Sequence, residues 1–267
     1  MTLRSLEALR EADVVCAEDT RVTGKLLAHF GIEKRLARLD EAMIGSRAAG
    51  VVERVAAGEV VAYCSDAGMP GVSDPGLRLV AAAREAGVAV EVLPGASAAA
   101  CAYVASGTVC PRFYFGGFFP RKDAERAALL DGLRALDAAL VFYESPNRLA
   151  SALAALAAAL PQREAAVCRE LTKLHEEVVR GPLPAVRDEF AERAGAGGRG
   201  VKGEIVIVVD GPNAAEGAAA AEGAQQAAAA RAAELKAAGA RNKDIARALA
   251  DEFGIARNVA YDLALKA

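Results

Sequence analysis

Three short segments combine glycine, serine and aspartate in a way that could hold a small polar ligand. They are AEDTR (17–21), SDAGMPGVSDPG (65–76) and LPGASA (93–98). In the second segment, Gly68 and Gly71 permit positive φ and close backbone approach, while Pro70 and Pro75 stiffen the chain. The carboxylate of Asp66 can accept hydrogen bonds from a hydroxyl or an amine. This segment therefore has the composition of a rigid binding loop.

The third segment has the composition of a helix start that could receive an anion. Gly95 is followed by three small residues, Ala96 to Ala98, and then by an apolar helical pattern. The free N–H groups at a helix N-terminus favour a carboxylate. The alternative is that these segments are only tight turns between strands and helices, with Ser97 as an N-cap.

The surrounding pattern predicts two α/β domains that position these loops. In the first half, apolar runs at 12–18, 59–64 and 88–94 each precede a helical run, which indicates a parallel sheet covered on both faces. Ligands of such sheets bind beyond the carboxyl ends of the strands. In the second half, EAAVCREL (164–171) and EEVVRGPL (176–183) lie too close together for a crossover and favour an antiparallel pair.

A turn-prone segment near Pro111 marks the expected boundary between an N-terminal domain, 1–110, and a C-terminal domain, 111–212. We expect a cleft between them. An alanine-rich linker and helix follow at 213–240. The last segment, 241–267, shows two helical patterns interrupted at Gly254 and resembles a helix-turn-helix.

Composition excludes several classes of protein. The net charge of −3 over 267 residues argues against a protein coated in basic residues for nucleic-acid binding. Five single cysteines and two distant histidines make a metal site unexpected. Apolar runs too short for a membrane span and the lack of a signal peptide indicate a cytoplasmic protein. The glycine motif GAGGRG (195–200) follows a helix, so we interpret it as a loop and not as a dinucleotide site.

Longer motifs resemble one known family. They are AEDTRVTGKLLAHFGI, SDAGMPGVSDPG, LPGASA, FYFGGFFPRK, FYESPNRL and CRELTKLHEEVVRG, in this order along the chain. Together they resemble the tetrapyrrole-methylase superfamily, in its branch of ribosomal RNA small subunit methyltransferases I. The resemblance implies two α/β domains, S-adenosylmethionine as cofactor, and methylation of the ribose 2′-hydroxyl of a cytidine in the decoding region of 16S rRNA. It also implies a homodimer that acts on 16S rRNA or on the small ribosomal subunit.

The resemblance also implies which residues contact the cofactor. They are Ser65, Asp66, Ala67, Gly68, Ser97, Ala98, Glu144 and Leu171. For the chemistry, Asp19 is a candidate base, Arg21 and Lys173 are candidate cations, and Glu144 is a candidate base or cofactor contact. Each of these four charged residues could instead form an ion pair that holds loops together.

One further expectation concerns the N-terminus, and another concerns alternative functions. Members of the family begin with an apolar strand and a loop that precede the residues matching Thr2 to Arg4, and the sequence has neither. We favour a misplaced start codon or a truncation over a natural short form. The alternative functions are a tetrapyrrole C-methyltransferase of the same fold, and a non-catalytic ribosome-binding relative.

Overall fold

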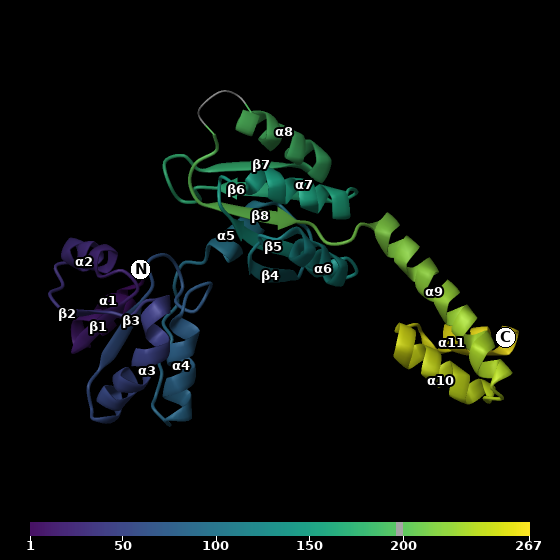
Figure 1. Ribbon diagram of the computed structural model, residues 1–267, viewed down its shortest axis with the longest axis horizontal. Helices are drawn as coiled ribbons and strands as arrows, with labels where there is room; N and C mark the ends of the chain where they lie inside the picture. Colours follow the sequence, from purple (N-terminus) through teal and green to yellow (C-terminus); the bar gives the residue numbers. More distant parts are fainter. Residues whose placement is uncertain (196–199) are drawn as a thin grey trace.

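The computed structural model describes residues 1–195 and 200–267, with the side chains of 219–221 left aside, so most of the GAGGRG segment lies outside it. Figure 1 shows three groups of elements: a small sheet with helices, a larger sheet with helices, and a set of C-terminal helices. The mixture of sheets and covering helices confirms the α/β class. In the described residues, no helix is both long and apolar enough to span a membrane.

The first sheet is parallel, as predicted. Its elements are α1 (Leu3–Glu11), β1 (Val14–Ala17), α2 (Thr20–His29), β2 (Arg35–Arg38), α3 (Glu41–Ala56), β3 (Val61–Cys64) and α4 (Gly76–Glu85). The strand order is β2-β1-β3. The central strand β1 is fully buried because Val15 packs towards α1 and α2 while Cys16 packs towards α3. This alternation explains why its four residues are all apolar.

The strand predicted at 88–94 is not formed. These residues have no regular secondary structure, and β3 pairs only with β1 among the described residues. An apolar run becomes a strand only where a neighbouring edge can supply hydrogen-bond partners. The alternating pattern of VAVEVL therefore indicated a propensity to form a strand, but these residues do not pair with the sheet. The segment is instead tied to α1 by an exposed ion pair between Arg4 and Glu91.

The second sheet mixes parallel and antiparallel strands. Its strands are β4 (Phe113–Phe118), β5 (Ala139–Glu144), β6 (Glu164–Arg169), β7 (Glu177–Pro182) and β8 (Ile205–Val209), in the order β4-β5-β8-β6-β7. The β6–β7 pair is antiparallel, which confirms the prediction from spacing. The last paired residues of the parallel β4–β5 pair are Phe118 and Tyr143.

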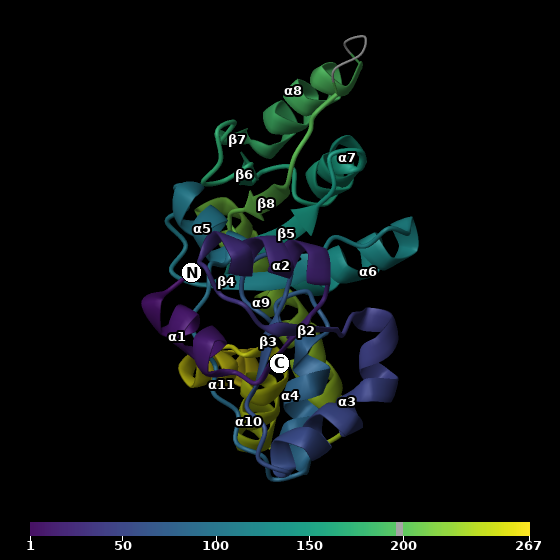
Figure 2. The same cartoon turned by 90° about the vertical axis from the view of Figure 1, so that its left-hand side faces the viewer.

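Helices cover the two faces of this sheet differently. On one face pack α6 (Asp123–Leu133), α7 (Leu149–Ala159) and α8 (Leu183–Gly195). On the other face packs α5 (Ala98–Ala105), whose Ala99 and Ala102 contact β5, β6 and β8. The segment before the expected boundary at 110 thus contributes a helix to the second sheet. Figures 1 and 2 show α5 beside β5 and β8.

Strand β4 contains two adjacent glycines, and one of them, Gly116, leaves room for the side chain of Phe142. A Cβ added to Gly116 would lie 2.4 Å from Cε1 of Phe142, whose ring is fully buried. We expect Gly116→Ala to lower the free energy of unfolding by about 1–3 kcal/mol, because the core would be overpacked. Gly132→Ala is the control, since that α6 position has open space around it. Urea denaturation followed by circular dichroism measures both, and equal stability of the two variants would contradict this packing.

The C-terminal helices form a small unit of their own. They are α9 (Ala214–Ala237), α10 (Asn242–Phe253) and α11 (Arg257–Lys266). Their shared core includes Ala232, Ile245, Leu249 and Ala260. Gly254 ends α10 in the left-handed conformation, which confirms the predicted break. Figure 1 shows this unit joined to the second sheet only through α9.

Candidate functional site

The first two predicted loops meet at the carboxyl ends of β1 and β3. The backbone N–H of Asp19 donates to the carboxylate of Asp66 at 3.0 Å. In return, the backbone N–H of Asp66 donates to the carboxylate of Glu18 at 3.4 Å. The two loops are therefore joined reciprocally, side chain to backbone, at the edge where α/β proteins bind ligands.

The 65–76 loop is held in shape by a side chain that the sequence analysis did not single out. The carboxylate of Asp74 accepts hydrogen bonds from the backbone N–H groups of Gly71 and Gly76, both at 2.8 Å. Gly68 and Gly71 adopt φ values of 81° and 86°, as their glycine identity requires. The loop is thus rigid, and it exposes the side chains of Asp66 and Ala67.

The third loop lies directly against the second. A Cβ on Gly68 would be 3.0 Å from the carbonyl oxygen of Ala96, and one on Gly95 would be 3.3 Å from Cα of Met69. Only glycine permits the two backbones to approach this closely. Ser97 caps α5 by accepting from the Ala100 N–H at 3.4 Å, and Ala98 is exposed in the first turn. The two predicted cofactor loops therefore form one continuous surface.

Tyr143 of β5 reaches this surface from the second sheet. Its neighbour Glu144 lies on the opposite face of that sheet. Tyr143 packs in the cluster that contains Ala99 of α5, and partly buried Leu171 joins the same cluster. Burial raises the pKa of Tyr143, while hydrogen bonds with the Ala99 backbone and the Ser97 side chain oppose that rise. By alternation, Glu144 lies on the face of Phe142.

Glu144 is fully buried at the end of β5. Its Oε1 accepts from the Ser145 N–H at 2.6 Å and pairs with Arg148 at 2.5 Å. Its Oε2 and the Nη1 of Arg148 are buried without a hydrogen-bond partner in the described part of the chain. Buried polar atoms are normally satisfied, so the described residues leave this ion pair incompletely hydrogen-bonded.

Asp19 and Arg21 form a local pair at the start of α2. The Asp19 carboxylate accepts from the Arg21 backbone N–H at 2.8 Å and from its guanidinium at 2.6 Å. The side-chain hydrogen bond from Arg21, followed by the backbone one, lowers the pKa of Asp19. A carboxylate with a lowered pKa accepts a proton weakly, which disfavours the general-base role. The role of Asp19 as base stays a prediction.

Lys173 lies in a loop with unusual backbone geometry. Glu170 and Thr172 on either side of Leu171 adopt positive φ values of 48° and 65°. The Lys173 ammonium pairs with Glu170 at 2.9 Å and with Glu204 at 3.1 Å. These hydrogen bonds raise the pKa of Lys173, so it is a cation at neutral pH. Lys173 is exposed and lies two residues along the chain from Leu171.

Glu18 is a functional candidate that sequence reasoning missed. It lies at the end of β1, beside Asp66. Burial raises the pKa of Glu18, and the charges of Asp66, Asp74 and Asp40 raise it further. A raised carboxylate pKa makes a better proton acceptor near neutral pH. The available signal was the acidic pair Glu18–Asp19 directly after a buried strand.

The raised pKa of Glu18 gives a stability prediction. The folded state binds this proton more tightly than the unfolded state, so the stabilisation is complete below pH 4.5 and is lost as pH rises through the folded pKa. We expect Glu18→Gln to raise the melting temperature at pH 7 by about 1–2 °C. Below pH 4 the difference in melting temperature should disappear. A lower melting temperature at pH 7 would contradict this.

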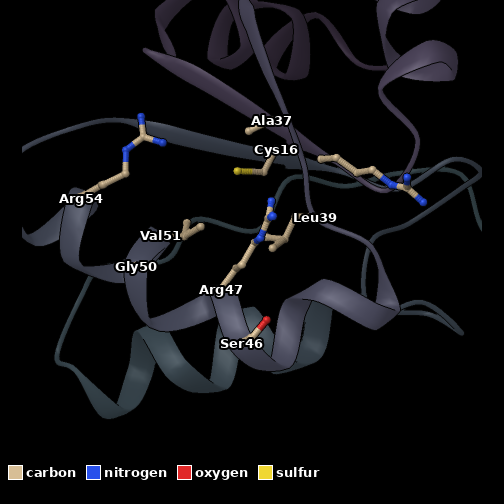
Figure 3. Close-up of a pocket in the computed structure, with 9 residues that line it drawn as sticks. Cys16, Ala37, Leu39, Ser46, Arg47, Gly50, Val51 and Arg54 are labelled. Carbon is tan, nitrogen blue, oxygen red and sulfur yellow. The ribbon is translucent and has the colours of Figure 1, made fainter.

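A cavity lies away from these loops. It has a volume of about 340 Å³ between β1, β2 and α3, and Figure 3 shows Arg47 and Arg54 of α3 rising towards Cys16 and Leu39. Arg38 and Arg54 pair with Asp40 and Glu59 respectively. Burial raises the pKa of Cys16, which makes its thiol a poor nucleophile. No predicted cofactor residue lines it, and no metal-type cluster occurs among the described residues.

Comparison of the sequence with known proteins gives consistent relatives. The sequence profile of the Tetrapyrrole (Corrin/Porphyrin) Methylases matches residues 1–187. A protein of Synechocystis is 36% identical over 267 residues, covering 100% of this chain and 92% of that protein. A protein of Mesorhizobium japonicum is 44% identical over 210 residues, covering 78% and 70%. Both are named Ribosomal RNA small subunit methyltransferase I.

Comparison of the structure agrees on the fold. The crystal structure of the methyltransferase CobJ matches with a TM-score of 0.58 at 21% identity, covering 79% of this chain and 88% of that chain. The crystal structure of diphthine synthase matches with a TM-score of 0.59 at 19% identity, covering 79% and 84%. At these identities the likeness concerns the fold alone. The chain therefore belongs to the tetrapyrrole (corrin/porphyrin) methylases and, among them, to the ribosomal RNA small subunit methyltransferase I family.

Proposed function

We propose that this rRNA methyltransferase transfers a methyl group from S-adenosylmethionine to the ribose 2′-hydroxyl of a cytidine in the decoding region of 16S rRNA. The observation that supports it best is the convergence of the 65–76 loop, the start of α5 and Tyr143 on one surface. The relatives that share 36–44% identity are named as ribosomal RNA small subunit methyltransferases.

The residues of this surface fit a nucleoside with a charged amino-acid tail. Exposed Asp66 offers a carboxylate to hydroxyl or amino groups, and the first turn of α5 at Ala98 offers backbone N–H groups to a carboxylate. Gly68 and Ala67 leave backbone accessible beside them. Bound S-adenosylmethionine supplies the electrophilic methyl group. The protein's task is then to align the ribose hydroxyl behind that carbon, and alignment alone gives a large acceleration.

Proton removal from the hydroxyl would use the charged groups around the loops. Glu18, with its raised pKa, is a stronger candidate base than Asp19. Arg21 and Lys173 keep their positive charges and would favour a developing alkoxide or hold a neighbouring phosphate. In this arrangement Asp19 positions Arg21, and Leu171 helps to close the surface.

The C-terminal helices would add contacts with RNA. The exposed face of α11 presents Arg257, Asn258 and Tyr261, a combination of cation, amide and aromatic ring. Such groups contact phosphates and bases. The whole protein, with a net charge of −3, would then approach RNA through local patches. We also propose the homodimer that the family resemblance implies, and exposed apolar side chains such as Val104, Val109 and Leu174 would be available to its interface.

The test maps the transferred methyl group. The chain is incubated with tritiated S-adenosylmethionine and either small ribosomal subunits or naked 16S rRNA from a strain that lacks the enzyme. We expect close to one methyl group per rRNA, in an alkali-resistant dinucleotide that contains cytidine. Label on a base, or no label in rRNA from either substrate, would contradict the proposal.

A further inference from the structure

Another cavity, with a volume of about 380 Å³, opens at the carboxyl ends of the parallel strands β4 and β5. It is lined by Phe118, Phe119, Pro120, Arg121, Ser145 and Arg148. Ligand pockets of small molecules begin at roughly this size. The position is also where ligands of α/β sheets bind, and none of the cofactor residues predicted from the sequence lines it.

The cavity combines an exposed aromatic ring with two guanidinium groups. Phe118 is 58% exposed, although large apolar side chains at strand ends are usually covered. Arg121 is exposed and forms no ion pair within the described residues. Arg148 also lines the cavity, with a side chain that is 24% exposed and paired with the buried Glu144. An aromatic face for stacking, next to cations for phosphate, is the composition that binds unpaired nucleotides.

The residues beneath the cavity are held in place by contacts within the protein. The Arg126 side chain is buried, donates from Nε to the carbonyl oxygen of Pro120 at 2.8 Å, and lies 5.4 Å from the centre of the Phe119 ring. Phe119 packs against Phe142 of β5 in the core. The loop that bears Phe118 and Arg121 is therefore preorganised, which reduces the ordering that a ligand must impose.

A short series of contacts connects this cavity with the cofactor loops. The Phe118 ring packs against the Tyr143 ring at 5.6 Å between centroids, and Tyr143 interacts with Ser97. From the first domain, Ser73 lies beside Gly117, since a Cβ there would be 3.5 Å from its hydroxyl oxygen. One aromatic residue thus separates the cavity from the surface proposed for methyl transfer.

We propose that this cavity holds an unpaired nucleotide of the RNA substrate next to the methylated one, with its base on Phe118 and its phosphates at Arg121 and Arg148. The inference rests on the proposed function and adds the element that grips the RNA strand. It explains why Phe118 stays exposed beside a buried ring.

The test measures binding of a fluorescein-labelled cytidine decamer by anisotropy, with an abasic phosphodiester of the same length as second probe. We expect Phe118→Ala to weaken decamer binding about 10-fold and to leave abasic binding unchanged. Arg121→Gln should weaken both probes and lower the salt slope by about one. The matched controls are Phe113→Ala, an exposed phenylalanine at the other end of β4, and Arg84→Gln, an exposed arginine of α4.

The inference is wrong if Phe118→Ala binds the decamer like wild type, or if Phe113→Ala loses as much. It is also wrong if wild type does not bind the decamer. Methylation of small subunits by the wild-type preparation is measured separately. An absence of methylation there removes the proposed function, while the decamer results still decide on the cavity.

Discussion

Replacing Gly68 by valine is expected to weaken binding of S-adenosylmethionine by roughly 10-fold to 30-fold. Gly68 has a φ of 81°, and an added Cβ would lie 3.0 Å from the carbonyl oxygen of Ala96. Valine disfavours this φ and would push the two loops apart. Because the proposed site is made by both loops, a shift of either one changes it. Isothermal titration calorimetry measures the effect.

Gly58→Val is the matched control for this experiment. Gly58 also has a positive φ, 103°, but an added Cβ there meets nothing within 4 Å. It lies between α3 and β3, at the opposite end of the strand from the loops. Both variants should lose stability because valine disfavours a positive φ, and only Gly68→Val should lose cofactor affinity. If both variants bind the cofactor with equal affinity, the contact between the two loops does not contribute to cofactor binding.

Replacing Arg163 by methionine is expected to lower the free energy of unfolding by about 3 kcal/mol. The Arg163 side chain is fully buried, pairs with Glu216 at 3.2 Å, and donates to the carbonyl oxygen of Arg134 at 2.5 Å. Its loss removes the donor to the Arg134 carbonyl oxygen and leaves Glu216 with the backbone N–H of Asn213. Because Glu216 lies in the capping box of α9, the start of that helix should also loosen. Urea denaturation and hydrogen exchange of residues 213–217 measure the two effects.

Two variants provide the controls for Arg163. Arg231→Met removes an arginine that pairs with Glu234 and Glu252 on the surface, and should cost less than about 0.5 kcal/mol. The double variant Arg163→Met with Glu216→Met removes both charges and should recover much of the loss. If Arg163→Met is as stable as Arg231→Met, the buried pair does not hold α9 to the second domain.

The sequence predicted the strands that are buried on two sides. Runs such as VVCA and IVIVV have enough apolar residues to specify a central strand without knowledge of its neighbours. The run at 88–94 has a similar pattern and forms no strand, because pairing depends on an edge elsewhere in the chain. Local pattern thus predicts the tendency to form a strand, and the sheet decides whether the strand forms.

The conformation of the loops that we propose as the site follows from the sequence more directly than the orientation of their side chains. Ser97, Gly68 and Asp66 come together because glycine and small residues limit which conformations their loops adopt. Tyr143 and Glu18, which we propose for the site, were missed because their neighbours Glu144 and Asp19 appeared more suited to the chemistry. Which of two adjacent residues faces the proposed site depends on strand alternation and on the helix packed against it. Both depend on the tertiary structure, which the sequence pattern alone does not show.

The central claim is that loops from both domains converge on one S-adenosylmethionine. Ultraviolet crosslinking of the radiolabelled cofactor to the protein, followed by peptide mapping, tests it most directly. We predict that the label appears in peptides containing residues 65–76, 93–98 or 143, and that it is lost in Gly68→Val. Label confined to the cavity between β2 and α3, or no specific label, would contradict the account.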